Sequence, residues 1–247
     1  MDTIVTANGA LFAGCEVSSS GFCAKTPFAD PPSPRKDFAA VFSRSAGGVY
    51  VVGGVNPVSG APLSDVWFQP LPQGTWRNLS FDGEQLGRVR AATFSFRGRQ
   101  LWVLDQKSGR TRLLRLDPMT STSTVFASWP SRGTATKWFL ALDRDGSILV
   151  SATSPAPAIS VTARVALDRP IPAITLVHVE KGELRGALLV DSHAYAFVVN
   201  GPGGTLRIRR HETLTNHRRS EGLEMLENIA GLEALARPDN DDGDPRR

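Results

Sequence analysis

The chain has 247 residues, 41% hydrophobic and 21% charged, which is enough apolar material for one large core. Its formal net charge is only +4, a small excess that does not predict a nucleic-acid-binding protein. No stretch approaches the roughly 18 consecutive apolar residues of a membrane span, and the first residues lack the basic start and apolar run of a secretion signal. With 23 arginines against five lysines, the basic residues have a bias typical of GC-rich bacterial genes.

Residues 1–34 are expected to form an N-terminal strand segment and a proline-rich connection. Residues 9–14 resemble residues 48–53 at an offset of 39, so this segment can supply a further repeat. Cys15 and Cys23 are close enough to form a disulfide in an oxidising compartment, which would favour an extracytoplasmic location. Two free thiols are the alternative, and the sequence leaves the location open.

An internal repeat dominates residues 35–212. The segments 39–43 and 91–95 match at four of five positions with an offset of 52. Taking Tyr50, Trp102, Leu149 and Tyr195 as equivalent gives spacings of 52, 47 and 46 residues, near the roughly 40 to 50 residues of a propeller blade. Each unit reads as short strands joined by polar or glycine-containing turns, and no stretch of this region has a convincing helical period.

One unit carries a family resemblance. Residues 50–54, Tyr-Val-Val-Gly-Gly, are followed by Trp67 and Trp76, and this pattern resembles a kelch repeat. The resemblance implies a β-propeller in which the paired glycines let neighbouring blades approach and the aromatic side chains fill the space between them. The predicted fold class is therefore all-β, a propeller of four or five blades or an incomplete ring, with a C-terminal helix and a disordered tail.

The helix and tail are expected in residues 213–247. Leu223, Leu226, Ile229 and Leu235 fall near helical spacing, and the residues after Pro238 are acidic and basic with little to bury. The strongest local charge asymmetry lies across the start of this region, a basic cluster that could attract a polyanion or could be a solvated edge strand and linker. Its members are Arg207, Arg209, Arg210, Arg218 and Arg219.

The common enzyme motifs are missing from the sequence. There is no Gly-x-Ser-x-Gly elbow, no phosphate-binding glycine loop and no Cys-x-x-Cys pair, and the spacing of His211 and His217 does not suit a zinc protease. No catalytic residue, metal site or cofactor is predicted.

The kelch resemblance implies a non-catalytic recognition or scaffold module that holds a protein or glycan through loops at one rim of the propeller. The ligand-binding residues predicted for such a module are Asn56, Ser59, Asp65, Trp76 and Arg90. Two alternatives remain: an extracytoplasmic propeller enzyme or its accessory domain, and a fragment of a larger secreted or surface protein that associates to complete the ring. Nucleic acid is not an expected partner.

Overall fold

The computed structural model is built from β-strands in two compact units. It describes residues 5–7, 10–17, 23–27, 32–43, 45–71, 74–95, 99–131, 133–142, 147–155, 158–167, 174–189, 195–200, 206–210 and 229. The first unit comprises Met1–Ser108 and Arg112–Phe126, and the second comprises Gly109–Thr111 and Ala127–Arg247. Within the described residues no helix is long and apolar enough to span a membrane.

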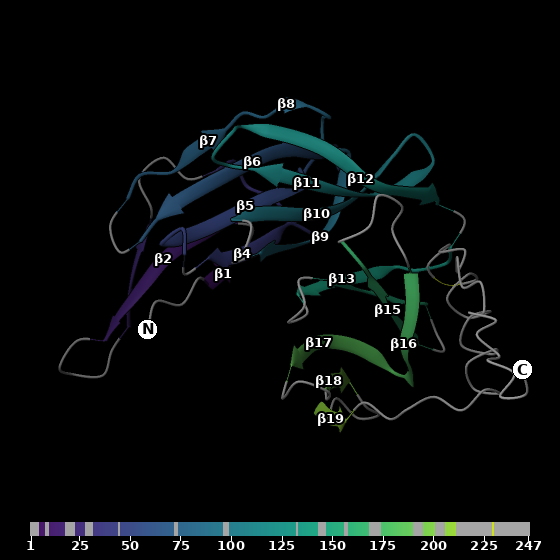
Figure 1. Ribbon diagram of the computed structural model, residues 1–247. Helices are drawn as coiled ribbons and strands as arrows, with labels where there is room; N and C mark the ends of the chain where they lie inside the picture. The colour runs from purple at the N-terminus through teal and green to yellow at the C-terminus, as the bar shows by residue number, and fades with distance from the viewer. Residues whose placement is uncertain are drawn as a thin grey trace, which may run out of the picture. The chain divides into compact units, whose positions relative to one another are not determined.

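Three sheets begin in the first unit, and neighbouring strands in each follow the chain order almost throughout (Figure 1). The first sheet has the order β1-β2-β3, the second β4-β5-β6-β7 and the third β8-β12-β11-β10-β9. The strands are β1 (Val5–Ala7), β2 (Ala10–Val17), β3 (Cys23–Pro27), β4 (Ala39–Ser43), β5 (Gly48–Val55), β6 (Pro62–Pro70), β7 (Arg77–Leu79), β8 (Asp82–Gly83), β9 (Arg88–Ser95), β10 (Gln100–Lys107), β11 (Arg110–Asp117) and β12 (Thr122–Pro130).

The second unit continues the same pattern with two further sheets among the described residues, β13-β14-β15-β16 and β17-β18-β19. Their strands are β13 (Lys137–Leu142), β14 (Ile148–Thr153), β15 (Ile159–Val165), β16 (Ile174–Lys181), β17 (Glu183–Leu189), β18 (Tyr195–Asn200) and β19 (Leu206–Arg210). The strands of these two sheets pair antiparallel, as expected for strands joined by short connections.

The core of the first unit lies between the second and third sheets. Strand β9 packs against β4, β5 and β6, and the side chains of Tyr50 and Phe94 stack with ring centroids 5.4 Å apart. Alternation along the strands places one set of apolar side chains on this inner face. The buried members of the cluster are Val41, Tyr50, Val52, Val66, Leu86, Val89, Phe94, Leu101, Val103, Leu114 and Leu116.

Strands β14 and β15 of the second unit pair through hydroxyl groups as well as through the backbone. Ser151 hydrogen-bonds Thr162 across the strands with an oxygen distance of 2.8 Å, and Thr153 hydrogen-bonds Ser160 at 2.7 Å. All four residues are buried. Because a buried hydroxyl is costly without a partner, these cross-strand pairs hold the register of the two strands.

The all-β prediction is confirmed, and the described strands form several separate sheets. The expected C-terminal helix and tail lie outside the described residues except for Ile229. That residue is buried, and its carbonyl accepts a hydrogen bond from the backbone N–H of Ala135 at 2.9 Å.

Candidate functional site

The two hairpins related by the sequence repeat have the same register at their centres. Ala39 pairs with Val52 in one sheet, and Ala91 pairs with Leu104 in the next, so the offset of 52 residues holds on both strands. Equivalent positions of the second and third sheets can therefore be compared one by one.

The registers then diverge at one end of the hairpins. In the second sheet the ladder ends at Ala39 and Val52, and an isolated bridge between Lys36 and Val55 follows in the same register. In the third sheet Leu104 pairs with Ala91 but Asp105 pairs with Val89, which leaves Arg90 as the extra residue of a β-bulge. A bulge redirects the side chain of its extra residue, and bulges are enriched beside functional sites.

Arg90 is held by a neutral partner. Its Nε and one terminal nitrogen donate to the amide oxygen of Gln106, at 2.9 and 2.6 Å. Burial lowers the pKa of the half-buried Arg90 guanidinium below its ordinary value, the positive charge of Arg88 lowers it further, and Asp37 opposes this effect. None of the ion pairs found among the described residues involves Arg90. A partly desolvated cation without a carboxylate in contact favours an anionic ligand.

The equivalent place in the second sheet is apolar. At the offset of 52, Arg90 corresponds to Phe38 and Gln106 to Gly54. A side chain at Gly54 would come within 3.0 Å of the Phe38 Cβ, so the benzyl group lies directly beside this glycine. The polar pair of the third sheet is therefore replaced by a phenylalanine and a glycine in the second.

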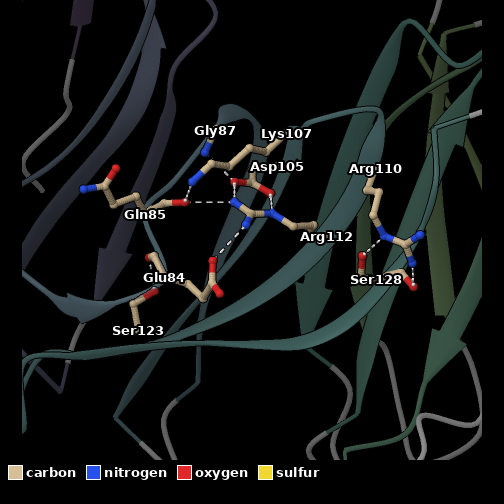
Figure 2. A network of polar contacts seen from close by, with 9 residues as sticks. All are labelled: Glu84, Gln85, Gly87, Asp105, Lys107, Arg110, Arg112, Ser123 and Ser128. Carbon is tan, nitrogen blue, oxygen red and sulfur yellow. Dashed lines mark hydrogen bonds and ion pairs between the residues drawn. The ribbon is translucent and has the colours of Figure 1, made fainter.

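A buried ion pair lies at the same end of the third sheet (Figure 2). Arg112 in β11 donates to both oxygens of Asp105 in β10, at 2.9 and 2.5 Å, and Asp105 is fully buried. Arg112 also reaches Glu84 and the carbonyl of Gln85, while the backbone N–H of Gly87 donates to Asp105. Hydrogen bonding to Asp105 raises the pKa of Arg112 above its ordinary value, and burial opposes that rise.

The second sheet has an ion pair at its own corresponding end. Arg35 has no exposed side-chain surface, and it uses all five of its N–H donors on Asp65, Ser33 and the carbonyl of Gly53. Burial alone would raise the pKa of Asp65, but hydrogen bonds from Arg35 and from the Trp67 indole outweigh it and lower that pKa. The Arg35–Asp65 pair fastens the segment that leads into β4, and the Arg112–Asp105 pair fastens the segment that leads into β9.

The ligand-binding residues predicted from the sequence are found in different settings. Asp65 is engaged by Arg35, and Arg90 lies in the bulge. Asn56 and Ser59 accept backbone hydrogen bonds within their own turn, from Val58, Ser59 and Ala61. Trp76 is buried against Val51, with Phe38 and Trp67 packed beside them. Only Arg90 therefore combines partial burial, positive charge and a neutral partner.

Other predicted sites lie outside what the structure describes. The backbone places Cys15 in β2 and Cys23 in β3, and Arg207, Arg209 and Arg210 in β19, but their side chains are outside the described part of the chain, as are Arg218 and Arg219 entirely. The disulfide and the polyanion patch stay predictions. Among the described residues no group of three or more histidine, cysteine, aspartate or glutamate side chains could hold a metal ion.

Sequence reasoning missed Gln106 and both ion pairs. Gln106 is an ordinary polar residue at the end of a strand, and only the register shift shows what it contacts. The signal that could have identified it is the internal alignment, in which Phe38 and Gly54 change to Arg90 and Gln106 while the flanking strands remain apolar.

Comparisons with known proteins give no family. No family model matches the chain, and no curated protein matches it. Among solved structures, a protein from Lactobacillus plantarum is similar with 14% identity and a TM-score of 0.48 over 84% of this chain and 66% of that one. A candidate 6-phosphogluconolactonase from Bacteroides uniformis is similar with 14% identity and a TM-score of 0.49, over 85% of this chain and 64% of that one. The chain spans about two thirds of the length of these two proteins.

The kelch resemblance is wrong, because no family model matches and neither similar structure is described as a kelch protein. Gly53 and Gly54 have positive φ angles of 57° and 108° beside a register shift between β5 and β6, whereas Asp105 and Gln106 fill the same positions in β10. The glycine pair is thus a feature of one bulged strand and does not recur in the next sheet.

The non-catalytic recognition module binding a protein or glycan is also wrong. It was an implication of the kelch resemblance, and the similar structures include a candidate enzyme.

Proposed function

We propose that the described sheets are blades of a β-propeller and that Arg90 binds a small anionic substrate on β9. The propeller is supported by the repeated antiparallel sheets, two of which have four strands in simple chain order. The close packing of β9 on the preceding sheet also supports it. Small-molecule sites in such folds are built where the ends of neighbouring strands and loops gather polar groups.

One observation carries the ligand proposal: Arg90 is the bulged residue of β9 and is oriented by the amide of Gln106. An arginine in this state offers a planar set of donors to a phosphate or carboxylate group. Arg88 adds a second positive charge at the same end of the strand. The substrate class is therefore a small molecule that carries a phosphate or carboxylate.

Calorimetric titration of the full chain with inorganic phosphate and with a sugar phosphate tests this proposal. Arg90→Gln should weaken binding by about 10- to 100-fold, since a hydrogen bond to a charged group contributes about 1.5–3 kcal/mol. Arg115→Gln, at an exposed position of β11, is the matched control because it changes the net charge equally. Equal affinities for wild type and both variants would contradict a role for Arg90.

A lactone that carries a phosphate belongs among the probes, because 6-phosphogluconolactonase is the activity named for one similar structure. Ring opening of the lactone releases acid, which can be followed at constant pH. Acid release by the wild type that is lost in Arg90→Gln would make the bound anion a substrate. Binding without acid release would restrict the site to ligand capture.

The completeness of the ring is tested separately. If further blades come from a second copy of the chain, sedimentation at increasing concentration should reveal a reversible dimer. A single sedimenting species with the mass of one chain would contradict assembly between copies.

A further inference from the structure

The contact between Arg90 and Gln106 uses one oxygen for two donors. The Gln106 amide oxygen accepts from the Arg90 Nε at 2.9 Å and from a terminal nitrogen at 2.6 Å. A guanidinium has five N–H donors in a rigid plane, so two of the five are used and the plane of the group is fixed. The other donors lie in the same plane, so their direction is fixed as well.

The chemical identity of the partner matters as much as its position. A carboxylate at position 106 would hold the guanidinium in the same place but would neutralise it with a bidentate ion pair. The neighbouring cluster shows this alternative, since Arg112 is held by both oxygens of Asp105 and contributes no uncompensated charge there. An amide oxygen orients Arg90 and leaves its charge in place.

The second sheet shows that the fold does not need this amide. The equivalent positions carry Phe38 and Gly54, and the isolated bridge between Lys36 and Val55 beyond them has the same register as the hairpin. The third sheet instead has a bulge at Arg90 with Gln106 across from it. The polar pair and the bulge therefore occur together in the third sheet, while the equivalent positions of the second sheet carry a phenylalanine and a glycine.

We propose that Gln106 is a positioning residue that selects anionic ligands, because it orients the guanidinium of Arg90 without cancelling its charge. This inference rests on the proposed binding of an anion by Arg90 and identifies what sets the specificity of that site. The ligand itself contacts Arg90, and Gln106 acts only through it.

The decisive variant is Gln106→Glu, which keeps the shape of the side chain and adds the cancelling charge. Titration of the full chain with inorganic phosphate should show affinity at least tenfold weaker than the wild type, while the melting temperature stays equal or rises because an ion pair replaces a neutral contact. A purely structural role for Gln106 would not lower phosphate affinity while stability is kept. Gln106→Met, similar in size but unable to accept these bonds, should weaken binding less than Gln106→Glu does, since it loosens Arg90 without neutralising it.

The outcomes separate this inference from the proposed function. If the wild type binds phosphate, Arg90→Gln loses it and Gln106→Glu binds as the wild type does, the role of Gln106 is refuted and the anion site stands. If the wild type binds neither phosphate nor a sugar phosphate, both proposals fail. Weaker binding in Gln106→Met than in Gln106→Glu would also refute the charge argument, because orientation alone would then set the affinity.

Discussion

The second and third sheets each have an ion pair at the same end, but the arginine and the carboxylate come from different elements in the two sheets. In each sheet an ion pair fastens the segment that precedes one strand, β4 in the second sheet and β9 in the third. In the second sheet the arginine comes from that entering segment, as Arg35, and the carboxylate from the third strand, as Asp65. In the third sheet β11 supplies the arginine, Arg112, and β10 supplies the carboxylate, Asp105.

An ion pair therefore lies at the same end of both sheets, although different segments of the chain supply its arginine and its carboxylate. An attraction between opposite charges depends on their separation and burial, and either strand can supply either sign. At the offset of 52, Arg35 corresponds to Gly87 and Asp105 to Gly53, so each of these two charged residues aligns with a glycine. Both arrangements still hold a backbone segment against the end of the sheet.

The two ion pairs differ in burial, and this predicts a difference in their effect on stability. Both side chains of the Arg112–Asp105 pair are at most 9% exposed, whereas Asp65 is 27% exposed beside a fully buried Arg35. Removing one member of a fully buried pair leaves an uncompensated charge and is more costly than weakening a partly hydrated one.

The largest effect is expected for Asp105→Ala. Among the described residues it leaves Glu84 as the remaining acidic partner of the buried Arg112 guanidinium, and the free energy of unfolding should fall by about 3–5 kcal/mol. Urea denaturation at neutral pH measures this change. The double variant Asp105→Ala with Arg112→Met removes both charges and should recover at least half of the loss. A double variant as unstable as the sum of the two single variants would mean that the pair is not coupled.

The next effect concerns Gly53, where β9 packs against β5. Gly53→Ala combines a positive φ of 57° with a clash against the Val89 side chain. Gly47→Ala is the matched control, since Gly47 has a φ of 64° and nothing within 4 Å of the added methyl group. The control should lose about 1–2 kcal/mol from the backbone conformation, and Gly53→Ala should lose about 1–3 kcal/mol more from overpacking. Equal losses in urea denaturation would show that the two sheets can separate to admit the methyl group.

The strand content and the repeat offset could be predicted from the sequence because both depend on local pattern. Alternating apolar residues and polar turns identified the hairpins, and the registers of Ala39 with Val52 and of Ala91 with Leu104 agree with the alignment. The kelch resemblance failed because it gave weight to Gly53 and Gly54 as a family signature. In the structure these glycines meet the steric needs of one bulge.

The candidate site could be predicted only in part. Arg90 was expected among the ligand-binding residues, but its bulge and its amide partner depend on a shift of register that no local pattern records. Asp65 was also among the predicted ligand-binding residues, and its bond with Arg35, which lies 30 positions earlier in the chain, could not be read from the sequence. Contacts of this kind arise from the pairing of strands, and two residues that meet carry no mark of it in one sequence.

The smallest of the three expected effects is that of Asp65→Asn, and it depends on pH. Hydrogen bonds from Arg35 and Trp67 lower the pKa of Asp65 in the folded chain. The carboxylate therefore stabilises the fold fully above the unfolded pKa of about 3.9, and this contribution is lost as the pH falls through the lowered folded value. At neutral pH the variant should be less stable by about 1.5–3 kcal/mol, and the difference from the wild type should shrink as the pH falls below about 4.

Asp82→Asn, at an exposed position of β8, removes the same charge outside these ion pairs and should change stability little. A loss in Asp65→Asn that stays constant down to the lowest pH at which the chain remains folded would mean that the shape of the side chain, and not its charge, holds Arg35.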